Sequence, residues 1–159
     1  MRNFLTGAAT SNSGKTTFTM GLLRALKRCG ISVQPYKCGP DYIDPMFHAI
    51  AAGRDTYMSS EDHVRELYAR YGADAECRVV EGVMGLFDGY DKYHGSGAEL
   101  AMLLDIPVVL VVNAKSVAYS VAPLIYGFAH FNPQLKLGGV VFNMVASENH
   151  YNFLRSACE

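Results

Sequence analysis

The stretch GAATSNSGKTT, residues 7–17, joins a short apolar run to an amphipathic segment. It ends in GKTT, which places a lysine and two hydroxyl side chains at the start of a predicted helix. A phosphate-binding loop needs consecutive backbone N–H groups, a helix N-terminus behind them and a lysine that reaches the outer phosphates. The stretch therefore predicts a nucleotide-binding loop between the first strand and the first helix of an α/β domain.

One position departs from the usual pattern of such loops. The pattern GxxxxGKT begins with glycine, where this chain has Ala9. Ala9 is small enough to fit, and Asn12 tolerates a left-handed backbone better than most residues with a Cβ atom. The alternative is a Ser/Asn-rich turn with a helix cap and an unrelated lysine. The predicted phosphate-binding residues are Ser11, Asn12, Ser13, Gly14, Lys15, Thr16 and Thr17, and the hydroxyl of Thr16 is the one that usually binds Mg²⁺.

Apolar runs of strand length alternate with segments of helical periodicity along the chain. The predicted strands occupy residues 3–8, 32–37, 77–81, 107–113 and 137–143. The predicted helices occupy residues 15–29, 45–52, 61–71, 97–104, 117–131 and 148–159. Apolar strands separated by helices are typical of a parallel sheet covered on both faces. We therefore expect a three-layer α/β P-loop NTPase fold with a mostly parallel central sheet flanked by helices, and a sheet that continues in a longer chain.

The bulk composition excludes several classes of protein. A chain of 159 residues is long enough for one domain that buries roughly 70% of its unfolded surface. Its 14 basic and 15 acidic side chains give no reason to expect nucleic acid or a membrane surface as a partner. The four cysteines form no CxxC pair, which favours free thiols in a reducing cytoplasm over disulfides or zinc. No run reaches the roughly 18 apolar residues of a membrane-spanning helix, so we expect a soluble protein.

The second predicted strand leads into PYKCGPDYIDP, residues 35–45. Ligands of open parallel sheets bind beyond the carboxyl ends of the strands, where this stretch places Lys37, Asp41 and Asp44. Asp44 precedes Pro45 and could act only as a helix N-cap, and Lys37 could be an edge-strand lysine. Asp41 precedes the helix and has no such structural explanation.

The third predicted strand ends in RVVEGVMGLFDG, residues 78–89. Glu81 follows two valines in a strand expected to be central, and an unpaired carboxylate there would cost several kcal/mol. We therefore expect a metal or another cation beside Glu81. The glycines that follow allow the backbone to approach a ligand, with Asp88 on the same loop. For Asp88, a solvated turn aspartate is the alternative.

These motifs together resemble one enzyme family. SNSGKTT, KCGPDYIDP, VVEGVMGLFDG, PVVLVVNA and GGVVFNMV are similar over essentially the whole chain to the cobyrinate a,c-diamide synthases, which are glutamine-dependent amidotransferases of cobalamin biosynthesis. The resemblance extends to the enzymes that act on hydrogenobyrinate. It implies that residues 1–159 are the N-terminal part of an ATP-dependent amidoligase domain, and that the C-terminal glutaminase domain is absent from this chain.

The resemblance also implies a reaction and its cofactors. ATP and Mg²⁺ would convert the a and c acetate carboxylates of cobyrinate or hydrogenobyrinate to acyl phosphates, which ammonia from glutamine would then amidate. The implied catalytic residues are Lys15, Lys37, Asp41, Glu81 and Asp88. The implied Mg²⁺ ligands are Thr16, Asp41 and Glu81. Substrate contacts are implied for Tyr42, Ile43 and Asp44, and an adenine contact for Asn143, whose alternative is a strand-end asparagine that starts a turn.

Two other functions stay open at this point. An enzyme with the same core and another acid substrate, such as dethiobiotin synthetase, would share the phosphate loop but not GPDYIDP. A nonenzymatic ATP-gated interaction module would dimerise with nucleotide, although Thr10 stands where dimerising switch ATPases carry a further lysine. A homodimer is compatible with every alternative. We expect the five histidines to lie on the surface or in helix packing, and the aromatic residues of the segment 117–131 to pack in the core.

Overall fold

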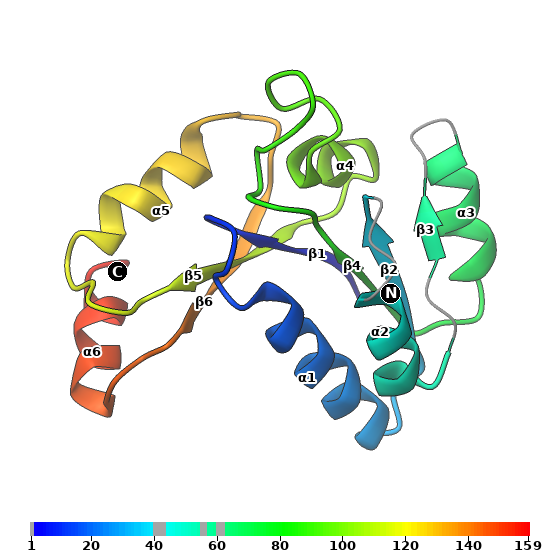
Figure 1. Cartoon of the computed structure of the whole chain (residues 1–159), viewed down its shortest axis with the longest axis horizontal. Coiled ribbons are helices and arrows are strands. Elements are labelled where there is room, and N and C mark those ends of the chain that lie inside the picture. Colours follow the sequence, from blue (N-terminus) through cyan, green and yellow to red (C-terminus); the bar gives the residue numbers. More distant parts are fainter. Residues whose placement is uncertain (1, 40–43, 55–56, 60–62) are drawn as a thin grey trace.

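The computed structural model describes residues 2–39, 44–54, 57–59 and 63–159 (Figure 1). Six strands of the described residues form one sheet in the order β3-β2-β4-β1-β5-β6, and every neighbouring pair is parallel. The strands are β1 (Arg2–Ala8), β2 (Val33–Cys38), β3 (Tyr57–Ser59), β4 (Cys77–Glu81), β5 (Val108–Asn113) and β6 (Leu137–Asn143). The helices are α1 (Lys15–Arg28), α2 (Asp44–Ala52), α3 (Val64–Tyr71), α4 (Gly97–Leu103), α5 (Val121–His130) and α6 (Glu148–Ser156).

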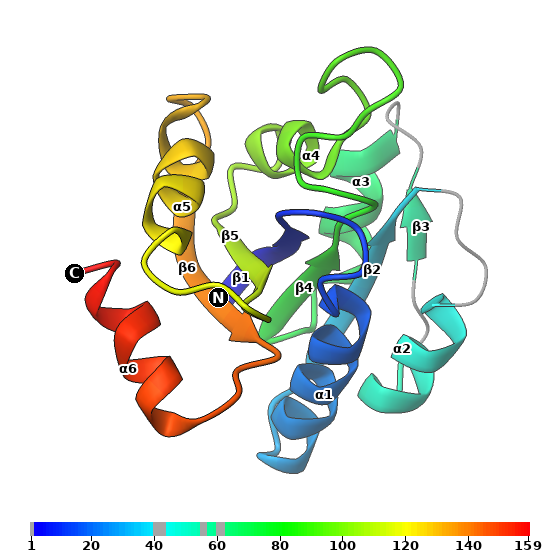
Figure 2. The ribbon, with the colours of Figure 1, turned by 60° about the vertical axis from the view of Figure 1, so that its left-hand side comes forward.

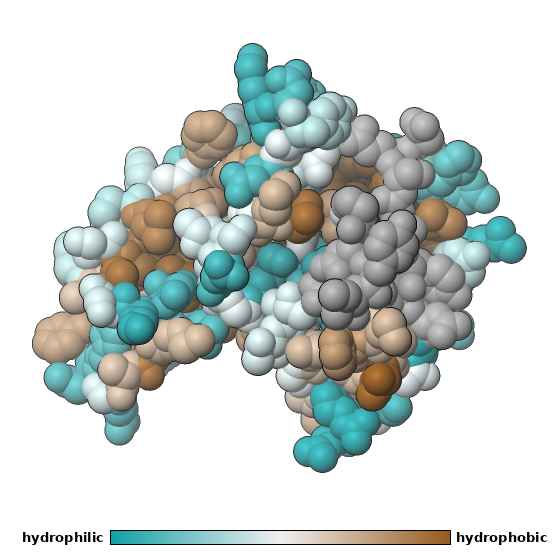
Figure 3. Space-filling model, in the orientation of Figure 1, coloured by the Kyte–Doolittle hydropathy of each residue, from teal (hydrophilic) through white to brown (hydrophobic). Residues whose placement is uncertain are grey.

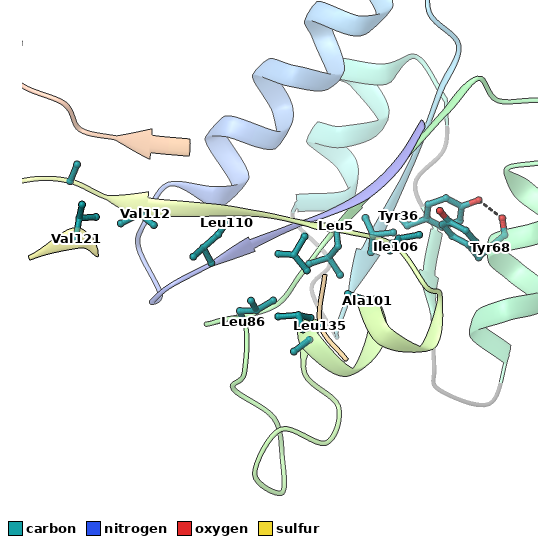
Figure 4. Close-up of a cluster of buried hydrophobic side chains, with 14 of the residues drawn as sticks. Leu5, Tyr36, Tyr68, Leu86, Ala101, Ile106, Leu110, Val112, Val121 and Leu135 are labelled. Atoms are coloured by element: carbon teal, nitrogen blue, oxygen red, sulfur yellow. Dashed lines mark hydrogen bonds between the residues drawn. The ribbon is translucent and has the colours of Figure 1, made fainter. Parts of the chain in front are cut away.

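Helices cover both faces of the sheet and produce the expected three layers (Figures 1 and 2). Helices α1 and α2 lie on one face, over a core cluster that includes Leu23, Val33 and Val79. Helices α3, α4 and α5 lie on the other face, over the larger cluster drawn in Figure 4, in which Leu5 is central. Alternation along each strand explains the two clusters, because successive side chains point to opposite faces.

The predicted fold is confirmed, with one strand missed. Strand β3 has only three residues and pairs with β2 at the edge of the sheet, which is too short for a periodic signal. Helix α5 begins at Val121 rather than at residue 117. Pro123 explains this difference, since its ring would clash with the carbonyl of Tyr119 in a helix that began earlier. The predicted start of the third helix, at residue 61, lies outside the described residues.

The aromatic residues of the α5 segment correct a second expectation. Tyr119, Tyr126 and Phe131 are exposed, and only Phe128 packs against the larger core cluster. The apolar character of this helix therefore exceeds what its own core contacts use. None of the described helices combines the length and apolar character that crossing a bilayer requires.

The topology brings distant segments to one edge of the sheet. In this order β1 lies between β4 and β5, so the chain crosses over β1 between those strands. Parallel strands end on the same side, which gathers the loop after β1 with Lys37 of β2, Glu81 of β4 and Asn143 of β6.

Candidate nucleotide-binding site

The loop between β1 and α1 has the backbone of a phosphate-binding turn. Asn12 adopts φ 63° and Gly14 adopts φ 83°, both in the left-handed region. The Oγ atom of Ser13 donates a hydrogen bond of 2.7 Å to the carbonyl oxygen of Thr10, which closes the turn. Helix α1 then begins at Lys15 with no acidic residue in its first turn, so its positive end stays available for an anion.

Buried hydroxyl groups fasten the start of α1 to the sheet. The Oγ1 atoms of Thr6 and Thr19 lie 2.8 Å apart, and Thr19 Oγ1 donates to the carbonyl oxygen of Lys15 at 2.9 Å. Thr6 belongs to β1, so these contacts fix the first turn of the helix relative to the central strand. These hydrogen bonds therefore fix the backbone of Lys15, the lysine that would contact a phosphate, relative to β1.

Asn143, at the end of β6, holds the loop from the opposite side. Its Nδ2 atom donates a hydrogen bond of 2.9 Å to the carbonyl oxygen of Ser13. A Cβ atom added to Gly14 would overlap the same Nδ2 atom. Asn143 therefore reaches the site through the loop backbone, a contact that neither sequence interpretation of this residue contained.

A buried carboxylate lies beneath the loop. Glu81 is 0% exposed, and three groups contact its Oε1 atom. Lys15 Nζ lies 3.1 Å away, Lys37 Nζ lies 3.0 Å away, and Thr16 Oγ1 donates a hydrogen bond of 2.6 Å. The prediction of a cation beside Glu81 is confirmed by the two lysines. Lys37 is buried in β2 and is not an edge-strand lysine, because β3 lies outside it.

The charge of Glu81 follows from these contacts. Burial by itself would raise the pKa of the carboxyl group, because it disfavours the charged form. The contact with His48, the charges of Lys15 and Lys37 and the hydroxyl of Thr16 together outweigh burial and hold the pKa well below its usual range. Glu81 is therefore an anion that keeps two ammonium groups at the floor of the site.

His48 is the site residue that the sequence analysis missed. It lies on α2, is 0% exposed, and places Nε2 at 2.6 Å from Glu81 Oε2. The separation is within ion-pair range, but the ring is poorly aligned with Oε2 and makes no hydrogen bond with it. A signal was present, because residues 48, 51 and 52 share one helix face and the other two are alanines. The large apolar residues Met46 and Ile50 lie on the opposite, exposed face.

A pocket opens above this cluster. Its volume is about 520 Å³, and its walls are the phosphate loop, Lys37, Val83 and Met84. Small-molecule sites in proteins commonly enclose about 300–1,000 Å³. The pocket thus has room for a nucleotide, with the two lysines at its base.

Other predicted residues are not part of this cluster. Asp41, Tyr42 and Ile43 lie outside the described residues, and Asp44 is described only as the first residue of α2. Asp88 is exposed, and its Oδ2 atom accepts a hydrogen bond of 2.9 Å from the backbone N–H of Gly85. This contact is the one expected for the turn alternative. Among the described residues, no group of three or more His, Cys, Asp or Glu side chains is arranged to hold a metal ion.

A parallel α/β sheet with a phosphate loop between its central strand and first helix defines a P-loop nucleotide-binding domain. The chain belongs to the family of CobQ/CobB/MinD/ParA nucleotide binding domains, which it matches over residues 5–159.

Within this family, the chain is similar to two kinds of corrinoid a,c-diamide synthase. The chain is 42% identical to cobyrinate a,c-diamide synthase of Listeria innocua, over 100% of this chain and 37% of the relative. It is 45% identical to hydrogenobyrinate a,c-diamide synthase of Brucella anthropi, over 100% of this chain and 38% of the relative. The resemblance found from the motifs is thereby confirmed, and the chain spans little more than a third of the length of these relatives.

Solved structures show the fold alone. The signal recognition particle 54 kDa protein of Aeropyrum pernix, in complex with GDP, superposes with a TM-score of 0.64 at 18% identity. The match covers 99% of this chain and 39% of that one.

Proposed function

We propose that this chain is the ATP-binding part of an amidoligase that converts the a and c acetate carboxylates of cobyrinate or hydrogenobyrinate to amides. The observation that carries the proposal is the convergence of Lys15 and Lys37 on one buried carboxylate oxygen at the floor of the pocket. The similarity to corrinoid diamide synthases supplies the substrate class.

The two lysines suit the electrostatics of this reaction. A carboxylate is inert towards ammonia until one of its oxygens becomes a leaving group, which phosphoryl transfer from ATP would provide. Bringing two unit negative charges to 4 Å costs about 4 kcal/mol near a protein surface. Lys15 and Lys37 offset this repulsion, since both ammonium groups are held where the outer phosphates and the acceptor carboxylate would meet. Asp88, on the loop after β4, is proposed to act at the same rim.

The oxygen donors at the site fit Mg²⁺. Thr16 Oγ1 and Glu81 Oε1 face each other at 2.6 Å, and hydroxyl and carboxylate oxygens are ligands that Mg²⁺ accepts alongside phosphate oxygens and water. Asp41 is the further ligand that we propose from the sequence. A bound Mg²⁺ would neutralise charge on the phosphates. Glu81 itself fixes the two lysines and the Thr16 hydroxyl around one point.

The corrinoid side of the site is proposed to involve the stretch GPDYIDP, with Tyr42, Ile43 and Asp44 as substrate contacts. Ammonia would come from glutamine through a glutaminase domain. We propose that this domain lies in the part of the longer relatives that this chain does not cover. None of the four cysteines, all of which the structure describes, forms a disulfide, which supports a reducing, cytoplasmic setting.

The test uses a protein of the same length as the relatives, assayed with cobyrinate, ATP, Mg²⁺ and glutamine. We expect Asp41→Ala and Glu81→Ala each to lower kcat by about a hundredfold or more, as loss of a preorganised charged group commonly does. Asp74→Ala is the matched control, because Asp74 is an exposed aspartate that pairs only with Arg54 among the described residues. Unchanged rates in both site variants would remove these residues from the mechanism.

The same assay separates the alternatives. Turnover of a small dicarboxylic or amino acid in place of the corrinoid would favour a dethiobiotin synthetase-like enzyme. Nucleotide-dependent dimerisation without carboxylate-dependent release of ADP would favour an interaction module.

A further inference from the structure

Glu81 is contacted differently at its two oxygens. Lys15, Lys37 and Thr16 all reach Oε1, which faces the phosphate loop. The other oxygen, Oε2, faces only His48 among the described residues. The carboxylate plane can rotate because the terminal torsion of a glutamate is broad and nearly two-fold. Lys15, Lys37 and Thr16 hold Oε1, and a contact at Oε2 adds a second constraint on the same carboxylate plane.

His48 has no other polar contact among the described residues. Its ring is fully buried, and neither ring nitrogen has a hydrogen-bond partner there. Burying an imidazole without such a partner is unfavourable, so an apolar side chain would be the better core residue if packing were the only role. The polar group that lies beside the ring is Glu81, whose Oε2 atom is 2.6 Å from His48 Nε2.

Helix α2 is built to bring this ring to Glu81. Ala52, one turn after His48, is buried and packs against the cluster under α1. Met46 and Ile50 lie on the opposite face, are 68% and 72% exposed, and contribute to the apolar surface that Figure 3 shows over α2. A helix that presents small residues inward approaches closely, which lets a side chain of intermediate length reach a carboxylate on β4.

We propose that His48 is a positioning residue, which holds Glu81 through Oε2 so that Oε1 stays aimed at the phosphate loop and at a cation bound with the nucleotide. The proposal rests on the proposed function only in assigning a nucleotide and a divalent cation to this pocket. His48 touches neither of them.

The test measures ligand binding by residues 1–159 rather than turnover. Affinity for Mn²⁺·ATP is measured by electron paramagnetic resonance, and affinity for ATP in EDTA by calorimetry. We expect His48→Leu to weaken Mn²⁺·ATP binding about tenfold or more, as loss of an outer-shell partner commonly does. Binding of metal-free ATP should stay within about threefold of the wild type, because the loop and Lys15 are retained. His48→Gln keeps a polar group near Oε2 and should recover most of the Mn²⁺·ATP affinity.

A merely structural role would give other results. Equal Mn²⁺·ATP affinity for the wild type and His48→Leu would overturn the proposal, and so would parallel losses of metal-free and Mn²⁺·ATP binding. Circular dichroism and thermal unfolding verify folding, and His63→Leu is the control at an exposed histidine. If His48→Leu does not fold, His48→Asn replaces it, since its shorter amide should not reach Oε2. Wild-type affinity in folded His48→Asn would equally overturn the proposal.

The outcome is independent of the substrate assignment. If the longer protein fails to amidate a corrinoid while the wild-type chain binds Mn²⁺·ATP, the proposed function fails and the role of His48 is still decided by the binding data. Failure of the wild-type chain to bind ATP in either form would overturn both proposals.

Discussion

Asn113 and Asn143 end neighbouring strands in direct register, yet they serve different ends. Asn113 Oδ1 accepts a hydrogen bond from the backbone N–H of Lys115, two residues away, and so stabilises its own turn. Asn143 donates to Ser13, 130 residues away in the chain. Sequence alone gives both residues the same appearance, because a strand-end asparagine is a turn signal in either case.

Asn143→Ala should therefore weaken nucleotide binding. Loss of one hydrogen bond costs about 1 kcal/mol, which corresponds to about a fivefold higher Kd for ATP because the Ser13 carbonyl is no longer held. Calorimetry with residues 1–159 measures the Kd. Asn113→Ala is the matched control and should bind ATP as the wild type does. A larger effect from Asn113→Ala than from Asn143→Ala would contradict the role given to Asn143.

The raised pKa of the Tyr68 hydroxyl predicts how the free energy of unfolding depends on pH. Its hydroxyl is buried without a hydrogen-bond partner among the described residues, and burial, only partly opposed by the charge of Arg78, raises its pKa to about 12. The unfolded pKa is about 10, so the folded state keeps a proton that the unfolded state loses between those values. The free energy of unfolding should fall as pH rises from 10 towards 12, by about 1 kcal/mol per pH unit from this group.

Tyr68→Phe removes the titrating group and the unpaired hydroxyl. We expect the variant to be at least as stable as the wild type at pH 8, and to lose less stability between pH 8 and pH 11. Urea denaturation at both pH values measures the difference. Tyr151→Phe is the control, because Tyr151 is exposed. Identical pH dependence in the wild type and Tyr68→Phe would contradict the assignment.

At the scale of elements, the start of α1 depends on Gly14. Its φ of 83° disfavours any residue with a Cβ atom, and a Cβ atom there would also overlap Asn143 Nδ2. Gly30, just beyond the same helix, has a similar φ of 77°, but a Cβ atom on it would meet nothing within 4 Å. Substitutions at Gly14 and Gly30 therefore distinguish the effect of backbone strain from the effect of a distorted phosphate loop.

Both Gly14→Ala and Gly30→Ala should lose about 1 kcal/mol of stability from backbone strain. Only Gly14→Ala should also weaken ATP binding, by about tenfold or more, because the N–H groups that meet the phosphates would be displaced. Thermal unfolding and calorimetry distinguish the two effects. Adding Asn143→Ala to Gly14→Ala removes the overlap but not the strain. Wild-type ATP affinity in Gly14→Ala would show that the loop does not hold the phosphates.

The elements also show where periodicity is a sound guide. The predicted bounds of β1, β4 and β5 agree with the structure to within one residue, because each strand contains a run of buried, mostly apolar residues, as is typical of central parallel strands. The predicted range of α2 agrees with the structure, and the helix turns Met46 and Ile50 outward and His48 inward, although Met46 and Ile50 are larger apolar residues than the alanines beside His48. The close approach of α2 to the sheet requires small inward residues rather than large apolar ones, and hydrophobic periodicity does not predict this.

At the scale of the whole molecule, the chain supplies a phosphate site but spans 37% of its Listeria relative. Tyr126 on α5, its flanking residues Tyr119 and Phe131, and the half-buried edge strand β6 form apolar surface that is exposed among the described residues. Such surface is commonly covered by another part of a protein or by a partner. We therefore expect nucleotide binding to be separable from complete catalysis.

We expect residues 1–159 to bind ATP but to show little or no glutamine-dependent amidation of cobyrinate. The physical reason is that the proposed ammonia source is a glutaminase domain, which this stretch of chain does not resemble. Calorimetry measures the binding, and mass spectrometry of the corrinoid measures amidation, with the longer protein as the positive control. Glutamine-dependent amide formation by residues 1–159 at the rate of the longer protein would contradict the proposal.

The sequence by itself determined the parallel sheet, the phosphate loop and the presence of a cation beside Glu81. Each of these follows from residues that are close together in the sequence. The apolar pattern of the strands, the composition of the loop and the cost of burying a charge can all be inferred without the tertiary structure. Only the tertiary structure decided which groups contact Glu81. Lys15, Lys37 and Thr16 contact Oε1, and His48 lies beside Oε2. The tertiary structure also decided that Asn143 donates a hydrogen bond to Ser13. Those contacts join strands and helices far apart in sequence, and the packing of α2 and the register of β6 set them.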